Sequence, residues 1–162
     1  MATYDSYETL FAAIQEAANV SLKTHVAPVV KQVEHETVNE VLDEYDPACY
    51  QRRKTDGLDD VNNMVDTVEG NTLIVVNNTE FNQTQDGNPN YHTSSSGIGL
   101  AGLIENGNNW DGHQYDYPYG DNVAEFTKPR PFTERTEEKL IETNAHVEAM
   151  KEGLREQGFE VK

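Results

Sequence analysis

Apolar residues recur every three or four positions between residues 6 and 44, and this spacing predicts a long helical region. Pro28 has no amide hydrogen and its ring clashes with the preceding turn, so we expect a kink or the meeting of two helices near it. Charged residues between the apolar positions, among them Lys31 and Glu34, are expected to face solvent. The apolar stripe consists of Leu10, Phe11, Ile14, Ala17, Ala18, Val26, Val29, Val30, Val33, Val38, Val41 and Leu42.

The next segment, residues 58–78, has the pattern of an antiparallel β-hairpin. The β-branched run TLIVVNN at residues 72–78 is typical of a strand, and residues 58–68 alternate loosely between apolar and polar positions. Glu69, Gly70 and Asn71 separate the two runs and form a turn signal. We therefore predict that residues 58–68 pair with residues 72–78.

Long polar stretches and two further helices complete the pattern. Residues 79–96 contain almost no apolar side chains and predict a long loop, whereas residues 98–106 predict a short helix that ends at Gly107. Residues 133–157 predict one long helix that ends at Gly158. The resulting fold class is α+β, a single domain of residues 1–162 in which the C-terminal helix packs on the small sheet. The expected buried positions of that helix are Leu140, Ile141, Asn144, Val147, Met150 and Leu154.

Composition limits how much core such a domain can form. Only 36% of the residues are hydrophobic and the mean hydropathy is -0.75, so either some segments are disordered or neighbouring subunits complete the fold. The formal net charge of -17 argues against a nucleic-acid-binding protein, which needs clustered cations. The N-terminus lacks the pattern of a signal peptide and no stretch is long and apolar enough to span a membrane, so we expect synthesis in a cytoplasm.

Motifs for catalysis, cofactors or metals are weak, and we predict none of these sites. Asp111, Asp116 and Asp121 carry oxygen ligands, but their spacing differs from that of a calcium-binding EF-hand loop. The five histidines lack the spacing of a zinc site on a helix, and the single cysteine, Cys49, is expected to be a small buried residue. The GIGLAG sequence at residues 97–102 matches a phosphate-binding glycine pattern but lacks the strand that should precede it.

Two short basic segments stand out in this acidic chain. Arg52, Arg53 and Lys54 are consecutive, and Pro129 and Pro131 flank Arg130. Such a patch is either solvated, or neutralises nearby acids of its own chain, or docks on the acidic face of the next copy in an assembly. The candidate interface residues are Arg52, Arg53, Lys54, Tyr91, Trp110, Tyr117, Tyr119, Lys128 and Arg130.

The order of several short motifs resembles a viral family. These motifs are YDPACYQRR at residues 45–53, the hairpin, LAGLIENG at 100–107, YPY at 117–119 and PRPF at 129–132. Together they are similar to the neck or tail-completion proteins of tailed bacteriophages, the group that includes lambda's minor tail protein Z. The long insert at residues 79–96 and the extended loop at residues 111–122 depart from that pattern.

The resemblance implies a structural virion protein at the head–tail junction, which forms a ring, typically of six subunits, with no enzymatic activity. Its implied partners are other copies of itself, a head–tail adaptor or stopper, and a tail terminator or tail tube protein, with DNA only as passing cargo. Phe132 would anchor the turn in the core, and Arg130 would face a carboxylate. The alternatives are a tail terminator or head-completion (stopper) protein and, from another class, a monomeric acidic module that binds a basic host protein.

Overall fold

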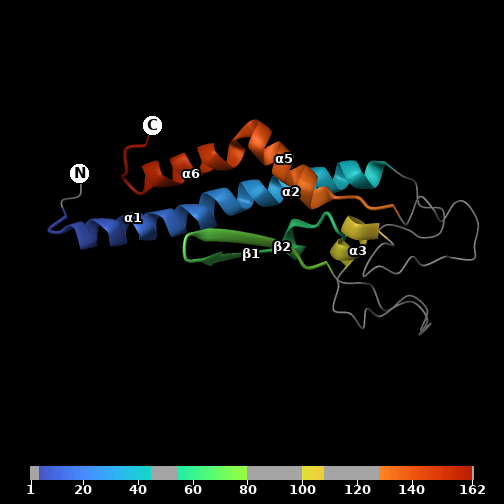
Figure 1. Ribbon diagram of the computed structural model, residues 1–162, viewed down its shortest axis with the longest axis horizontal. Helices are drawn as coiled ribbons and strands as arrows, with labels where there is room; N and C mark the ends of the chain where they lie inside the picture. Colours follow the sequence, from blue (N-terminus) through green and yellow to red (C-terminus); the bar gives the residue numbers. More distant parts are fainter. Residues whose placement is uncertain (1–3, 45–54, 80–99, 108–127, 162) are drawn as a thin grey trace, which may run out of the picture. The chain divides into compact units, whose positions relative to one another are not determined.

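A computed structural model describes residues 4–44, 55–79, 100–107 and 128–161 of the chain (Figure 1). The described part is a mixed α+β fold with a long N-terminal helical region, a two-stranded antiparallel sheet and C-terminal helices, as the sequence predicts. Its elements are α1 (Tyr7–Ser21), the π-helical turn η1 (Leu22–Val26), α2 (Ala27–Asp43), the 3-10 turn η2 (Val61–Asn63), β1 (Met64–Glu69), β2 (Thr72–Asn77), α3 (Leu100–Asn106), α5 (Phe132–Thr143) and α6 (Ala145–Glu156).

The chain divides into two compact units, which we describe separately. Unit 1 comprises residues 1–33, 65–76 and 136–162, and unit 2 comprises residues 34–64 and 77–135. Of the long predicted loop at residues 79–96, only Thr79 lies within the described residues, and it is buried.

The N-terminal helix begins at a capping box. The Thr9 amide donates to Ser6 Oγ at 3.3 Å, and the Ser6 amide donates to Thr9 Oγ1 at 3.2 Å, so two amides of the first turn are satisfied. The irregularity predicted near Pro28 takes the form of the π turn η1, after which Ala27 donates to the carbonyl of Leu22. A wider turn just before proline accommodates a residue that cannot donate to the preceding turn.

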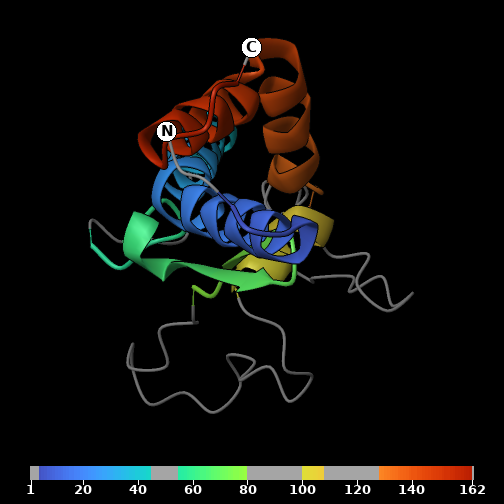
Figure 2. The same ribbon diagram turned by 90° about the vertical axis from the view of Figure 1, so that its left-hand side faces the viewer.

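In unit 1 the N-terminal helix lies between α6 on one side and the hairpin on the other, as both Figure 1 and Figure 2 show. α6 packs against α1 and η1. The C-terminal helix was expected to cover the sheet, and this expectation is wrong for α6. Its apolar side chains meet the apolar stripe of α1, which offers a longer surface than a two-stranded sheet does.

The predicted continuous helix at residues 133–157 is also wrong, because Asn144 separates α5 from α6. Asn144 has φ +53°, in the left-handed region, and the chain changes direction there (Figure 2). Asparagine adopts this conformation more readily than most residues because its short polar side chain can bond locally. Ile141, one of the expected buried positions, is 63% exposed. The predicted end of the helix at Gly158 is confirmed, and Gly158 lies in the left-handed region at φ +88°.

The hairpin is shorter than predicted, because β1 begins only at Met64. The preceding residues form a turn and η2, where Asp60 Oδ1 accepts the Asn62 amide at 2.9 Å. The two-residue connection places Glu69 opposite Thr72, and Gly70 has the positive φ that such a turn needs. Burial alternates along both strands, so each strand has an inner and an outer face.

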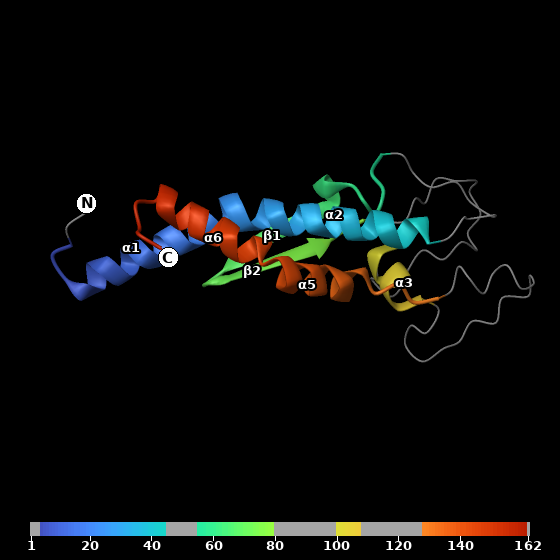
Figure 3. The same ribbon diagram turned by 90° about the horizontal axis from the view of Figure 1, so that it is seen from above.

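Unit 2 has its own hydrophobic core. α3 lies beside the C-terminal part of α2 (Figure 3), and Phe132 at the start of α5 completes the core with an exposure of only 3%. The sequence pattern correctly predicts α3 and its end at Gly107, which has φ +61°. The buried members of this core are Val38, Val41, Leu58, Ala101, Ile104 and Phe132, with Leu42 and Leu100 packed against them.

Candidate functional site

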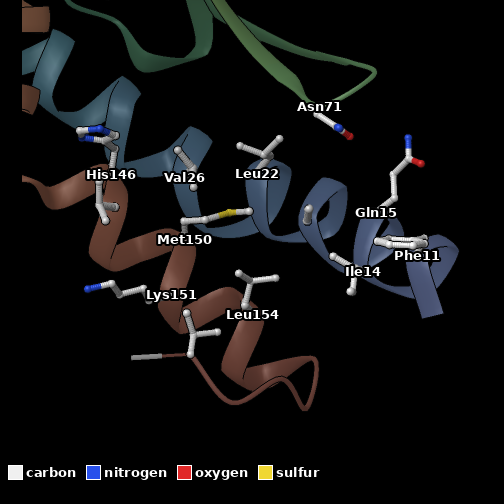
Figure 4. Close-up of a pocket in the computed structure, with 13 residues that line it drawn as sticks. Phe11, Ile14, Gln15, Leu22, Val26, Asn71, His146, Met150, Lys151 and Leu154 are labelled. Carbon is white, nitrogen blue, oxygen red and sulfur yellow. The ribbon is translucent and has the colours of Figure 1, made fainter. Parts of the chain in front are cut away.

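Unit 1 contains an apolar groove with a volume of about 640 Å³. One wall comes from α1 and η1, and the other comes from α6 (Figure 4). The lining residues follow helical spacing on each wall, so each helix presents one continuous face. In Figure 4 the side chain of Met150 lies between the walls, near Leu22. The apolar lining residues are Phe11, Ile14, Ala18, Leu22, Val26, Val147, Met150, Leu154 and Val161.

Four polar residues also line the groove: Gln15, Asn71, His146 and Lys151. Lys151 points away from the groove in Figure 4, and its Nζ donates to Glu148 Oε1 at 2.8 Å. This ion pair lowers the pKa of the exposed Glu148 carboxyl. His146 Nδ1 is buried and has no hydrogen-bond partner among the described residues. The groove therefore suits an apolar side chain or segment better than a charged small molecule.

The apolar face of α1 continues beyond the groove. Phe11 is 66% exposed and Tyr7, one turn earlier, is 80% exposed. Large aromatic side chains at positions i and i+4 share one helix face, so Tyr7, Phe11 and Ile14 form an uncovered stripe. Contiguous exposed apolar surface is typical of protein–protein contact sites.

α6, which forms the wall of the groove opposite α1, packs closely against the end of α1 and against η1. Gly153 of α6 faces Ser21 and His25, and a Cβ at residue 153 would lie 2.6 Å from Ser21 Cβ and 2.9 Å from His25 Cδ2. Ser21 is fully buried and donates to the carbonyl of Ala17 at 2.7 Å. His25 Nε2 lies 3.2 Å from Glu156 Oε2 of α6. Small residues thus allow the two backbones to come close.

In unit 2 a buried carboxylate joins α2 to the end of β2. Glu34 was expected to face solvent, but its exposure is only 8%. Its Oε1 accepts from Asn77 Nδ2 at 3.2 Å, and the same nitrogen donates to the carbonyl of Leu58 at 2.9 Å. Asn77 Oδ1 accepts the Thr79 hydroxyl at 2.6 Å. Through these contacts Asn77 joins the Glu34 carboxyl of α2 to the carbonyl of Leu58 and to the hydroxyl of Thr79.

Burial raises the pKa of Glu34, and repulsion from Glu105 adds to the rise, against the hydrogen bond from Asn77. The folded protein therefore keeps this proton to a higher pH than the unfolded chain does. The contribution of Glu34 to stability is present below its ordinary pKa and is lost as pH rises through the raised value.

We expect Glu34→Gln to stabilise the protein by roughly 1 kcal/mol at pH 8, because glutamine keeps the bond to Asn77 without a buried charge. The difference should vanish near pH 4, where the native carboxyl is protonated. Thermal unfolding across this pH range measures the effect, with Glu16→Gln at an exposed position of α1 as the control. A loss of stability at pH 8, or a gain that is the same at both pH values, would contradict this account.

The predicted interface residues have different places in the structure. Arg130 is buried at 4% exposure; its amide donates to the carbonyl of Ile104 at 2.9 Å, and its Nη1 donates to the carbonyl of Lys128 at 3.1 Å. It therefore lies inside unit 2 and is not offered at the surface, whereas Lys128 is exposed. The other candidates lie outside the described residues: Arg52, Arg53, Lys54, Tyr91, Trp110, Tyr117 and Tyr119.

The remaining chemical candidates also lie mostly outside the described part. This holds for Cys49, for the aspartates at residues 111–121 and for residues 97–99 of the glycine pattern, while Gly102 is part of α3. Among the residues that the structure describes, no three histidine, cysteine, aspartate or glutamate side chains gather to hold a metal ion. No helix in the same part of the chain is long and apolar enough to cross a bilayer.

Sequence reasoning identified the apolar stripe of α1 but missed that part of it stays uncovered. It also missed Glu34, although a signal was present. Glu34 follows Val30 by four positions and precedes Val38 by four, so it lies within the apolar stripe.

Comparison with known proteins gives a match to a family model. No curated protein and no solved structure matches the chain. A family model named YomN matches residues 6–156, which is nearly the whole chain and includes both units. That family is phage-derived, of the kind found in Bacillus prophages. The chain therefore belongs to the YomN family, and this membership indicates a phage origin.

Proposed function

We propose that this protein is a structural subunit of the phage virion that forms a ring at the head–tail junction and joins the head connector to the tail. Membership of a phage-derived family supports a phage role, and the order of motifs resembles neck and tail-completion proteins. A hexamer is the form that this resemblance implies. Its partners would be further copies of the chain, a head-side adaptor or stopper, and a tail terminator or tube protein.

The observation that carries this proposal is the uncovered apolar stripe of Tyr7, Phe11 and Ile14, which runs into the groove of unit 1. The acidic side chains of this chain, with a formal net charge of -17, keep it soluble. Exposed aromatic side chains on one helix face do not add to solubility, and they are typical of a protein–protein contact site. In a ring, this stripe and groove would be buried against an adjoining subunit. Such burial would also offset the small core that the low apolar content allows.

Charge added to the stripe should block incorporation into particles. We expect Phe11→Glu to reduce the amount of this protein in purified particles by at least about tenfold, because a buried unpaired carboxylate opposes the contact. Ala12→Glu is the matched control, because it adds the same charge at the neighbouring exposed position on another face of α1. Quantitative mass spectrometry of particles from complemented deletion strains measures both, with circular dichroism to check folding.

Normal incorporation of a folded Phe11→Glu variant would show that the stripe is not a virion contact. Complete absence of the wild-type chain from particles would overturn the proposed function. Capture of a basic host protein by the monomer would then favour the acidic binding module instead.

A further inference from the structure

We propose that the β1–β2 hairpin is the seam between neighbouring copies, in which the open edge of β1 in one copy pairs with the open edge of β2 in the next. This inference rests on the proposed ring and names the surface that closes it. A second copy of this chain is the partner.

Each strand has one partner within the described residues, because the sheet has the order β1–β2. The register that pairs Glu69 with Thr72 turns the main-chain groups of Asp66 and Val68 to the open edge of β1. The same register turns those of Leu73 and Val75 to the open edge of β2. The bond from the Asn78 amide to the carbonyl of Asn63, at 2.8 Å, fits this alternation. Open edges of this kind are templates for a strand from another chain.

The outer face of the hairpin adds an apolar surface to these edges. Val65 is 46% exposed and Val76 is 47% exposed; the register places them opposite each other, with Ile74 nearby on the same face. The inner face of the sheet is apolar too, apart from Asp66 and Asn77. A two-stranded sheet on its own is only marginally stable. Strands added from neighbouring copies would extend its apolar face and form hydrogen bonds with the main-chain groups of its open edges.

Charge selects a second copy as the partner. The two strands contain two ionisable side chains, Asp66 and Glu69, and Asp66 forms an ion pair with Lys31 of α2. Strongly acidic chains repel one another wherever their acids gather, so copies meet most easily where carboxylates are few. A basic partner would find little on this surface to attract it. Self-pairing therefore matches the hairpin better than capture of a cationic protein.

Repetition of the hairpin also has the geometry of a ring. When β2 of one copy lies beside β1 of the next, neighbouring strands remain antiparallel around the assembly. Each contact joins two different strand edges and is therefore a heterologous interface. An assembly built from such interfaces has no free strand edge only when the ring is complete. An isologous β1–β1 or β2–β2 contact would stop at a dimer.

Disulfide crosslinking between singly substituted chains tests the seam. In a Cys49→Ser background, one cysteine is placed on the outer face of either strand, and β1 and β2 variants are mixed pairwise. A disulfide needs Cα atoms roughly 4.4–6.8 Å apart, so only neighbouring strands in register will join. The positions are Val65, Thr67 and Glu69 on β1, and Thr72, Ile74 and Val76 on β2.

We expect at least one β1–β2 mixture to give about tenfold more crosslinked dimer than Glu152→Cys, an exposed α6 position that reports random collision. The reaction is run on the purified full-length chain and on assembled particles. Exclusive β1–β1 or β2–β2 products would overturn head-to-tail pairing. If particles contain the protein but give no more crosslinked dimer than the collision control, the proposed seam is wrong and the proposed virion role is unaffected. If the protein is absent from particles but the purified chain gives β1–β2 dimers, the virion role is wrong and the seam is supported.

Discussion

Replacing Phe132 with alanine is expected to lower the free energy of unfolding by about 3–5 kcal/mol, the largest effect of any substitution considered for this chain. Phe132 is a member of the unit 2 core and is almost fully buried. Its truncation leaves a cavity among side chains of α2 and α3, which cannot collapse without moving their backbones. Since folded domains are stable by only about 5–15 kcal/mol, this loss threatens the unit itself.

The residues around Phe132 make collapse of that cavity difficult. The Arg130 amide is bonded to the carbonyl of Ile104, and the Thr133 amide and hydroxyl both donate to Glu105 Oε2 at 3.1 Å. Arg135 forms an ion pair with Glu44, the residue that follows α2. The turn is therefore tied to α3 and α2 on both sides of Phe132.

Urea unfolding followed by circular dichroism measures the effect of Phe132→Ala. Ile141→Ala is the matched control, since Ile141 is mostly exposed and its truncation should cost less than about 1 kcal/mol. Comparable losses for the two variants would show that Phe132 does not anchor the turn.

Gly153→Ala is expected to destabilise unit 1 by about 1–3 kcal/mol, even though alanine normally favours a helix over glycine by about 1 kcal/mol. The new methyl group would meet the Cβ and Oγ of Ser21 at 2.6 and 2.7 Å, so α6 must move away from the end of α1. That movement would also disturb the packing of Met150 and Leu154 along the groove.

A double substitution tests whether this clash is the cause. Ser21→Gly removes the two closest atoms that the new methyl group would meet and leaves His25 Cδ2 at 2.9 Å, so Gly153→Ala should cost less in that background than in the native one. Glu152→Ala, at the exposed neighbouring position, serves as the control for helix propensity. Stabilisation by Gly153→Ala alone would contradict the close helix approach, and calorimetric unfolding of the native protein, the two single variants, the double variant and the control measures the effect.

The N-terminal helix shows how far the sequence pattern reaches. Its apolar stripe correctly predicts a helical region that ends near residue 44, because the period of an amphipathic helix is a property of local sequence. The stripe does not predict which of its residues are covered by other elements. Phe11 belongs to the stripe and is mostly exposed, whereas Glu34 lies within the same stripe and is buried. Coverage depends on tertiary packing, which no local period records.

The C-terminal helices show the opposite limit. Residues 133–157 consist largely of good helix formers, and one asparagine in the left-handed region divides them. A single backbone conformation of this kind leaves the apolar period almost unchanged, so the pattern could not predict the break. The two prolines that flank Arg130 favour an interface residue, but its burial and its bonds to main-chain carbonyls are not visible in its sequence neighbours.

The phage origin and the proposed ring are supported by different kinds of observation. The phage origin follows from family membership, whereas the ring and its position are proposals that rest on motif order, the uncovered stripe of α1 and the open hairpin edges. These surfaces lie on different elements, so a ring subunit could use one toward its neighbouring copy and another toward the adjoining ring.

Cryo-electron microscopy of tailed particles tests the central claim most directly. The account predicts a symmetric ring at the head–tail junction whose density fits the helices and hairpin of this chain, with neighbouring hairpins in contact. If particles from a strain that expresses the protein contain no such ring, the account is contradicted. The monomeric acidic binding module would then be the hypothesis to test.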